Sequence, residues 1–241
     1  MSTLVKVARF HLVQPYQYLV VLWGVLTFSF AVNLAIYALV PIGHNPLGAT
    51  DPAVVPDGRY TGAVASFFIY FLVLGMQSIG RSLPFGLSLG VSRRSYYAGT
   101  ALLAAALAVV DGLVLAVLQV LERLTGGWGV RMGFFRIPYL LAGPWYLTWV
   151  SSFVALTLLF VYGMWYGIVF RRWGLVGTVI FIAAQITVLL GAALVVTWAQ
   201  GWTSVGHFFT GLTAAGLTGL LAVLAAALLA GGHATIRRAT I

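Results

Sequence analysis

Long apolar runs separated by short polar segments dominate the chain. Six such runs fall at about residues 16–40, 62–80, 98–121, 146–169, 175–199 and 209–231. A helix needs about 20 apolar residues to cross roughly 30 Å of hydrocarbon. No ten-residue pattern of alternating apolar and polar positions suggests an outer-membrane barrel. The pattern therefore predicts an all-α integral membrane protein with six transmembrane helices.

A shorter amphipathic stretch precedes the first run. Over residues 2–14, Ser2, Lys6 and Arg9 fall on one face of a helix, and mostly apolar residues fill the rest. Pro15 follows and favours a turn into the bilayer. We therefore expect an N-terminal amphipathic interfacial helix at the membrane surface. The first apolar run is too long for a signal peptide, so we expect no cleavable signal.

Composition excludes a soluble domain. Of the 241 residues, 61% are hydrophobic and only 7% are charged, so the chain cannot cover a water-facing surface. We expect a single transmembrane domain, residues 1–241, in a lipid bilayer and without internal repeats. The net charge of +9 does not indicate nucleic-acid binding, because the basic residues form short clusters at the ends of apolar runs.

The basic residues predict the orientation, because Lys and Arg collect in the cytoplasmic loops of membrane proteins. With the N-terminus inside, the cytoplasmic segments hold no acid and nine basic residues: Lys6, Arg9, Arg81, Arg93, Arg94, Arg171, Arg172, Arg237 and Arg238. The outer segments then hold Arg59, Arg123, Arg131 and Arg136 together with Asp51, Asp57 and Glu122. We therefore expect a protein of the cell membrane with both termini in the cytoplasm.

The connections between the runs are unequal. On the outside we expect an irregular loop at 41–61, an interfacial segment at 122–145 and a short connection at 200–208. On the inside, the sequence RRWG joins the fourth and fifth runs, whereas residues 81–97 form a long connection. This asymmetry argues against two equivalent halves.

Asp111 is the ionisable residue nearest the middle of a predicted span. A carboxyl group there costs about 2.5–3.5 kcal/mol and often marks an ion or substrate pathway. One hypothesis is a proton or cation site in a secondary transporter. The alternative is a structural carboxyl group that is hydrogen-bonded to a neighbouring helix, for instance to Gln185 or Thr187.

Other chemistry finds little support in the sequence. His11, His44, His207 and His233 lie in separate segments without ligand spacing, and the chain has no cysteine, so we expect no metal site. Ser151 and Ser152 lack a GxSxG context. Lys6 is the single lysine and has no phosphate-binding loop around it, so the chain binds no ATP in that manner. We therefore expect no enzymatic activity and no cofactor bound by this chain.

Small residues at helical spacing predict close helix packing. They occur as Gly163 and Gly167 in GMWYG, as Ala215 and Gly219 in AAGLTG, and as Ala222 and Ala226 nearby. These faces fit a dimer interface or packing within one subunit, and the sequence does not distinguish the two.

The long inner connection carries the most distinctive local sequence, LPFGLSLGVSRRSYYAGT, residues 83–100. Pro84 and Gly86 are expected to break the second helix, and Arg93 with Arg94 marks the inner boundary of the third. Between them, the short apolar ridge FGLSLG needs a protein surface to cover it in water. The alternative is an amphipathic loop that rests on lipid headgroups.

This segment resembles the permease subunits of the type-2 ABC exporter family, in which LGVSRR is followed by aromatic residues and a small residue. The surface helix, the six spans, the cytoplasmic termini and the lack of a nucleotide site are similar to that family over essentially the whole chain. One departure is that the helical excursion frequent in the family between spans five and six is nearly absent here.

The resemblance implies that residues 81–97 include a coupling helix, which docks on a separate ATP-binding subunit. The implied contact residues are Leu87, Leu89, Val91 and Ser92, followed by Arg93 and Arg94 as anchors and by Tyr96 and Tyr97. Two ATPase subunits, which bind ATP and Mg²⁺, would pair with this chain and with a second permease, identical or not.

The expected function is thus the membrane-spanning permease subunit of an ATP-driven exporter for an amphipathic substrate such as a drug, a peptide antibiotic or a lipid. Two alternatives remain open. One is an ion-gradient-driven transporter that uses Asp111, and the other is a membrane anchor or assembly protein that transports nothing.

Overall fold

The computed structural model describes residues 16–39, 61–80, 82–88, 90–137 and 143–238. Within these residues the fold is helical and has no β-strand. The elements are η1 (Tyr16–Val21), α2 (Leu22–Leu39), α3 (Ala65–Gly80), α4 (Leu83–Ser88), α5 (Arg93–Leu124), η2 (Gly127–Arg131), α6 (Trp145–Trp198), α7 (Trp202–Gly211) and α8 (Ala214–Arg238). The expected interfacial helix at 2–14 and almost all of the loop at 41–61 lie outside the described residues.

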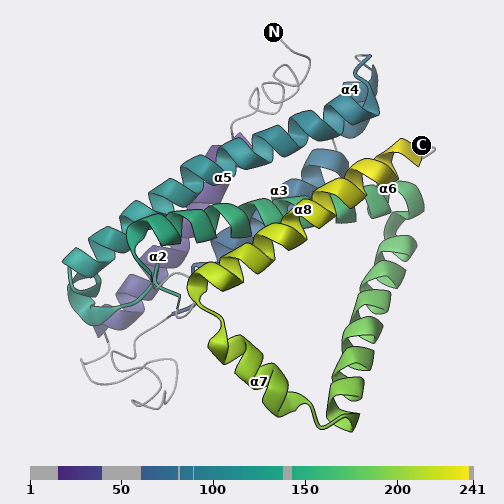
Figure 1. Ribbon diagram of the computed structural model, residues 1–241. Coiled ribbons are helices and arrows are strands. Elements are labelled where there is room, and N and C mark those ends of the chain that lie inside the picture. Colours follow the sequence, from purple (N-terminus) through teal and green to yellow (C-terminus); the bar gives the residue numbers. More distant parts are fainter. Residues whose placement is uncertain (1–15, 40–60, 81, 89, 138–142, 239–241) are drawn as a thin grey trace.

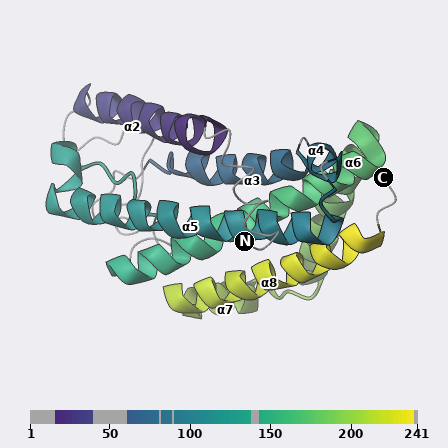
Figure 2. The ribbon, with the colours of Figure 1, turned by 90° about the horizontal axis from the view of Figure 1, so that it is seen from above.

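The first half of α6 lies at the centre of the bundle. It packs against α3, α5 and α8, while α2 lies against α3 (Figures 1 and 2). Two ends of the bundle can be distinguished. One end carries α4, the start of α5 and the C-terminal end of α8, and the opposite end carries η2 and the start of α6. We call these the α4 end and the η2 end.

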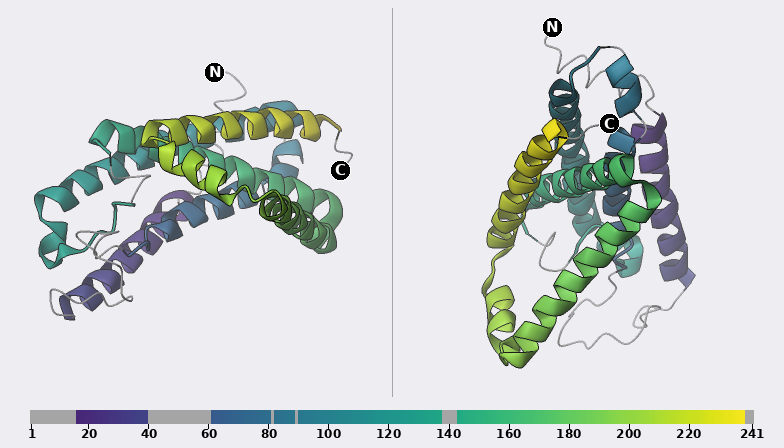
Figure 3. Two further views of the ribbon diagram at one scale, coloured as in Figure 1. Left: turned by 60° about the horizontal axis from the view of Figure 1, so that its bottom comes forward. Right: turned by 90° about the vertical axis from the view of Figure 1, so that its right-hand side faces the viewer.

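Helix α6 is 54 residues long and bends at Gly174, where φ is 65° and ψ is −159°. This backbone conformation is essentially restricted to glycine, so the RRWG sequence sets the position of the bend. The half after the bend leaves the bundle and reaches α7 at its far end (Figure 3). Its apolar side chains are largely exposed, with Leu189 at 70% and Trp198 at 94%.

Among the described residues, four helical segments are long and apolar enough to cross a membrane: Tyr16–Leu39, Arg93–Leu124, Trp145–Trp198 and Ala214–Thr235. The bent α6 covers both the fourth and the fifth predicted runs, and α3 is a shorter apolar helix of 16 residues. The sixth run differs from the prediction. It is interrupted at Leu212, whose backbone is extended, and α7 and α8 lie on either side of the break.

Glycines set the close approach of α3 and α6. A Cβ on Gly75 of α3 would overlap the Phe160 carbonyl oxygen, and a Cβ on Gly163 of α6 would overlap the Leu72 carbonyl oxygen. A Cβ on Gly167 would lie 2.8 Å from the Met76 carbonyl oxygen. The GMWYG face therefore packs within the chain. By contrast, a Cβ on Gly219 of α8 would meet nothing within 4 Å.

Candidate functional site

The segment that resembles a coupling helix lies at the α4 end of the bundle. After α3, the chain forms the short helix α4 and then turns at Gly90, where φ is 79°. The turn is closed by the Gly90 amide, which donates to the Leu87 carbonyl oxygen (3.0 Å), and by the Val91 amide, which donates to the Gly86 carbonyl oxygen (3.2 Å). The positive φ explains the glycine in the LGVS sequence.

Ser92 caps the N-terminus of α5. Its hydroxyl oxygen accepts a hydrogen bond from the Ser95 amide at 3.2 Å, and the Ser92 hydroxyl donates to the Ser95 hydroxyl oxygen at 2.9 Å. A serine cap of this kind typically contributes about 1 kcal/mol to a helix. The helix therefore begins at Arg93, five residues before the predicted start of the span at 98. Arg94 in its first turn is exposed.

Tyr96 and Tyr97 point into the bundle, and neither side chain is more than 2% exposed. The Tyr96 hydroxyl donates to the Ser78 carbonyl oxygen of α3 at 2.8 Å, and the Tyr97 hydroxyl donates to the Leu229 carbonyl oxygen of α8 at 3.2 Å. The two tyrosines therefore hold α5 to α3 and α8. This corrects the expectation that they face a partner, because adjacent helical positions here point to two neighbouring helices of the same chain.

The apolar side chains of the segment differ in how deeply they are buried. Leu83 is buried at 1% exposure, and Leu87 and Val91 are partly buried against the core. Leu89 lies outside the described residues. Gly86 touches the Tyr96 ring so closely that a Cβ would lie 2.6 Å from it, which fixes α4 on the start of α5. Among the described residues of the segment, Ser88, Gly90, Ser92 and Arg94 are exposed.

Asp111 lies inside the bundle with a side chain that is 2% exposed. Trp23 of α2 hydrogen-bonds to its carboxyl group. The second carboxyl oxygen, Oδ2, is buried without a hydrogen-bond partner. Next to it, Gly112 brings α5 close to α6, since a Cβ there would lie 3.2 Å from the Phe153 amide nitrogen. The carboxyl group thus links α2 to the α5–α6 core.

The two polar residues predicted as partners of Asp111 are bonded elsewhere. Gln185 Oε1 accepts hydrogen bonds from the Tyr162 and Tyr166 hydroxyls, each at 2.7 Å, across the bend of α6. The Thr187 hydroxyl donates to the Ala183 carbonyl oxygen of its own helix at 2.9 Å. The predicted pairing with Asp111 is therefore wrong, because both residues lie on the half of α6 that leaves the bundle.

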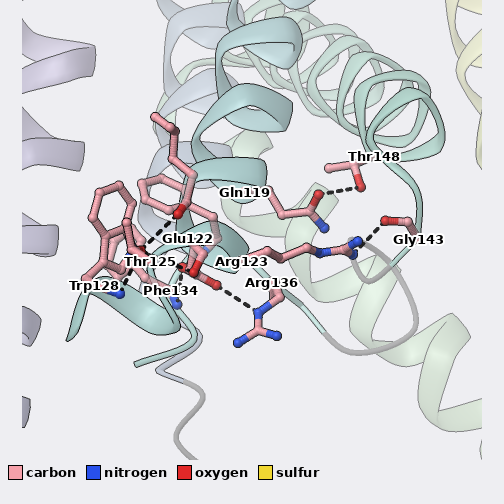
Figure 4. A network of polar contacts seen from close by, with 11 residues as sticks. Gln119, Glu122, Arg123, Thr125, Trp128, Phe134, Arg136, Gly143 and Thr148 are labelled. Carbon is pink, nitrogen blue, oxygen red and sulfur yellow. Dashed lines mark hydrogen bonds and ion pairs between the residues drawn. The ribbon is translucent and has the colours of Figure 1, made fainter. Parts of the chain in front are cut away.

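A carboxylate that the sequence did not single out organises the η2 end. Glu122 is fully buried near the end of α5. Its Oε2 accepts from the backbone amides of Phe134 and Phe135, both at 2.8 Å, and from the Trp128 indole at 3.3 Å. Its Oε1 forms an ion pair with Arg136 Nε at 3.0 Å (Figure 4).

Further bonds tie the same end to the start of α6 (Figure 4). The Thr148 hydroxyl donates to Gln119 Oε1 at 3.2 Å, and Arg123 Nη2 donates to the Gly143 carbonyl oxygen at 2.7 Å. The predicted interfacial segment is therefore folded back onto α5. A buried charge is tolerated when it is paired and hydrogen-bonded, so this arrangement fits a structural role. We call Glu122 and its partners Trp128, Phe134, Phe135 and Arg136 the Glu122 clasp.

The remaining candidate residues do not form a catalytic or metal centre in the part of the chain that is described. Ser151 shares a hydrogen bond of 2.7 Å with Thr218 of α8, and the Ser152 hydroxyl is buried without a partner. No three His, Cys, Asp or Glu residues among those described are grouped to hold a metal ion. His233 instead lies beside the Tyr97 ring, with 6.1 Å between ring centroids.

Comparison with protein-family models, with curated proteins and with solved structures gives no match for this chain.

Proposed function

We propose that this chain is the membrane-spanning permease subunit of an ATP-driven ABC exporter. The observation that carries the proposal is the geometry of residues 83–94: a short helix and a capped turn between two apolar helices, at one end of the bundle. Together with the resemblance of its sequence to type-2 ABC exporter permeases, this arrangement supports a coupling element for a separate ATPase.

The proposed topology has six spans and both termini in the cytoplasm. The four long apolar segments support it. Helix α6 is long enough for two crossings joined at Gly174, so these segments account for five spans, and α3 supplies the remaining one. The α4 end would then face the cytoplasm. Because the chain has no cysteine, single cysteines at Ser88 and Arg131 can be labelled in intact cells. The topology requires Ser88 to be protected from impermeant reagent and Arg131 to be labelled.

The proposed complex contains two permease and two ATPase subunits, and ATP and Mg²⁺ bind to the ATPases. ATP binding and hydrolysis there would move the permeases between inward- and outward-facing states. The amphipathic nature of the substrate is proposed from the many aromatic residues and from the lack of a charged cluster within the described spans.

Co-purification tests the proposal. Affinity-tagged chain from native membranes should bring down a P-loop ATPase. The R93E/R94E variant should lose at least about tenfold of it, because charge reversal at a docking surface costs several kcal/mol. R131E is the matched control, since Arg131 is exposed at the η2 end. A chain that purifies alone, or with a partner that lacks a P-loop, would favour one of the two alternatives, the ion-gradient-driven transporter or the membrane anchor or assembly protein.

Asp111 favours a second candidate, an ion-gradient-driven transporter. Its buried Oδ2 has no hydrogen-bond partner, as in residues that exchange a proton or cation. The D111N variant keeps the size of the side chain and separates the two functions. Loss of a transport activity that persists without ATP would support the gradient-driven mechanism, whereas retained ATP-dependent transport would support the exporter.

A further inference from the structure

The bend of α6 carries a group of basic and aromatic side chains that the proposed function does not use. Arg171, Arg172 and Trp173 are consecutive in α6, and Trp173 directly precedes Gly174. The bend lies at the α4 end of the bundle in each view (Figures 1 and 3). In a helix that turns back into the membrane, the bend is expected to lie at the boundary between hydrocarbon and water, where Trp and Arg are common.

Arg171 is half-buried and lacks an acceptor for its inner donor. Its Nε is buried without a hydrogen-bond partner. Arg171 follows Gly167 by one helical turn, and Gly167 packs against Ile79 and Gly80 at the end of α3. A guanidinium group carries five N–H donors, and leaving shielded donors unsatisfied is costly, so an acceptor is needed at this position.

Arg172 and Trp173 form the exposed side of the same group. The guanidinium carbon of Arg172 lies 4.8 Å from the centroid of the Trp173 ring, which is a cation–π contact. Trp173 itself is 55% exposed. This contact holds the Arg172 side chain close to the aromatic ring.

No acid of this chain can neutralise the pair within the described residues. Asp111 is inside the bundle and Glu122 is bonded at the η2 end, and the two other acids of the sequence lie outside the described part. Exposed apolar side chains lie in α6 on either side of the bend: Phe170 at 47% before it, and Leu175 at 71% and Val176 at 70% after it. Cationic donors and exposed apolar side chains thus occur within a few residues of each other at the bend.

We propose that Arg171, Arg172 and Trp173 form a binding site for an anionic phospholipid, with the phosphate on the guanidinium groups and the acyl chains along Phe170, Leu175 and Val176. Arginine binds phosphate through paired N–H donors, and tryptophan prefers the headgroup region. Basic pockets beside transmembrane helices bind anionic headgroups in this way. The site does not depend on an ATPase partner, so it can be tested separately from the proposed function.

The test uses the full-length chain in detergent, with phosphatidylglycerol as the anionic lipid and phosphatidylcholine of the same acyl chains as the neutral one. Retained lipid is counted by native mass spectrometry. The parent chain should retain phosphatidylglycerol preferentially, and R171Q/R172Q should bind it about tenfold more weakly, as expected when charge-assisted bonds are lost. The R94Q variant removes an exposed charge at the same end and should bind like the parent.

Several results would overturn the proposal. The first is a parent chain without preference for phosphatidylglycerol, and the second is an R94Q variant that loses as much as R171Q/R172Q, which would indicate diffuse charge attraction. The third is equal competition by inorganic phosphate at the same concentration, which would indicate a site for free phosphate. If R171Q/R172Q does not fold, phosphatidylglycerol binding is measured for the single variants R171Q and R172Q instead. Binding equal to that of the parent chain in both would also refute the site.

Discussion

Gly163 of α6 lies so close to Leu72 of α3 that an added Cβ would overlap the Leu72 carbonyl oxygen. The backbones of α3 and α6, not their side chains, are therefore in contact at this point. Membrane helices depend on such packing because lipid and protein interiors are equally apolar. The relationship also explains why a 16-residue helix is stably placed in the bundle.

The G163A variant should lower the thermal midpoint of the chain in detergent. One methyl group at a backbone contact forces α3 and α6 apart, and overpacking of this kind costs about 1–3 kcal/mol. G191A is the matched control, because a Cβ at this helical glycine would meet nothing within 4 Å. Its midpoint should equal or slightly exceed that of the parent, as alanine is the better helix former. Equal midpoints for G163A and the parent would contradict the assigned contact.

Replacement of Glu122 should lower the thermal midpoint more than G163A does. In E122Q the ion pair with Arg136 is lost, and an amide cannot accept as many bonds from Phe134, Phe135 and Trp128 as the carboxylate does. Breaking a buried, hydrogen-bonded pair costs about 3–5 kcal/mol. The measurement is the thermal midpoint together with protease sensitivity of the η2 end.

R131Q serves as the control for this clasp because it removes an exposed charge from the same end. It should behave like the parent. If E122Q and R131Q have the same stability, Glu122 does not organise this end of the bundle.

The sequence predicts that the fold is helical and apolar, because hydrophobic length alone sets where a chain can cross a membrane, but it does not predict the break at Leu212 within the sixth run. It also places the connection at RRWG, since glycine and arginine interrupt the apolar run there. Residue contacts are harder to predict. Tyr96 and Tyr97 are amphipathic and fit a water-facing loop or a helix interface equally well, and only the early start of α5 directs them inward.

The partners of the two acids could not be predicted for related reasons. Trp23 counts as apolar in a hydropathy pattern, so its indole donor to Asp111 is hidden from the sequence. Glu122 is bonded to backbone amides of residues 134 and 135, which reach it only because the following segment folds back. Backbone amides are present at nearly every residue, so no sequence pattern indicates which of them bind Glu122.

The contact of Gly86 with the Tyr96 ring makes α4 sensitive to a single methyl group. In G86A the Cβ would lie 2.6 Å from the ring, so α4 should be displaced from the start of α5. A spin label on a cysteine at Ser88 should then become more mobile, and binding of the proposed ATPase should weaken. G80A is the control, since a Cβ at Gly80 would meet nothing within 4 Å. Unchanged label mobility in G86A would refute the docking of α4 on Tyr96.

The polar group of Tyr162, Tyr166 and Gln185 should limit the angle between the two halves of α6. In Q185L both tyrosine hydroxyls lose their bond to Gln185 Oε1, and each such bond contributes about 0.5–1.5 kcal/mol. The distance between spin labels on cysteines at Leu190 and Leu220 should therefore become more broadly distributed. T187V removes a hydroxyl that bonds only within its own helix, so it should leave the distribution unchanged.

Gly174 should determine the bend itself. Its φ of 65° and ψ of −159° place it in a region that other residues occupy only at a cost of about 1–3 kcal/mol. In G174A the backbone is expected to relax toward a conformation open to alanine, which changes the direction in which the second half leaves the bundle. The mean distance between labels at Leu190 and Leu220 should shift, whereas in G191A, on the same half of α6, it should stay as in the parent. Because the packed first half is held by α3, α5 and α8, the shift should occur without loss of the Tyr96 and Tyr97 contacts. An unchanged distance in G174A would mean that contacts along α6, and not the glycine, fix the bend.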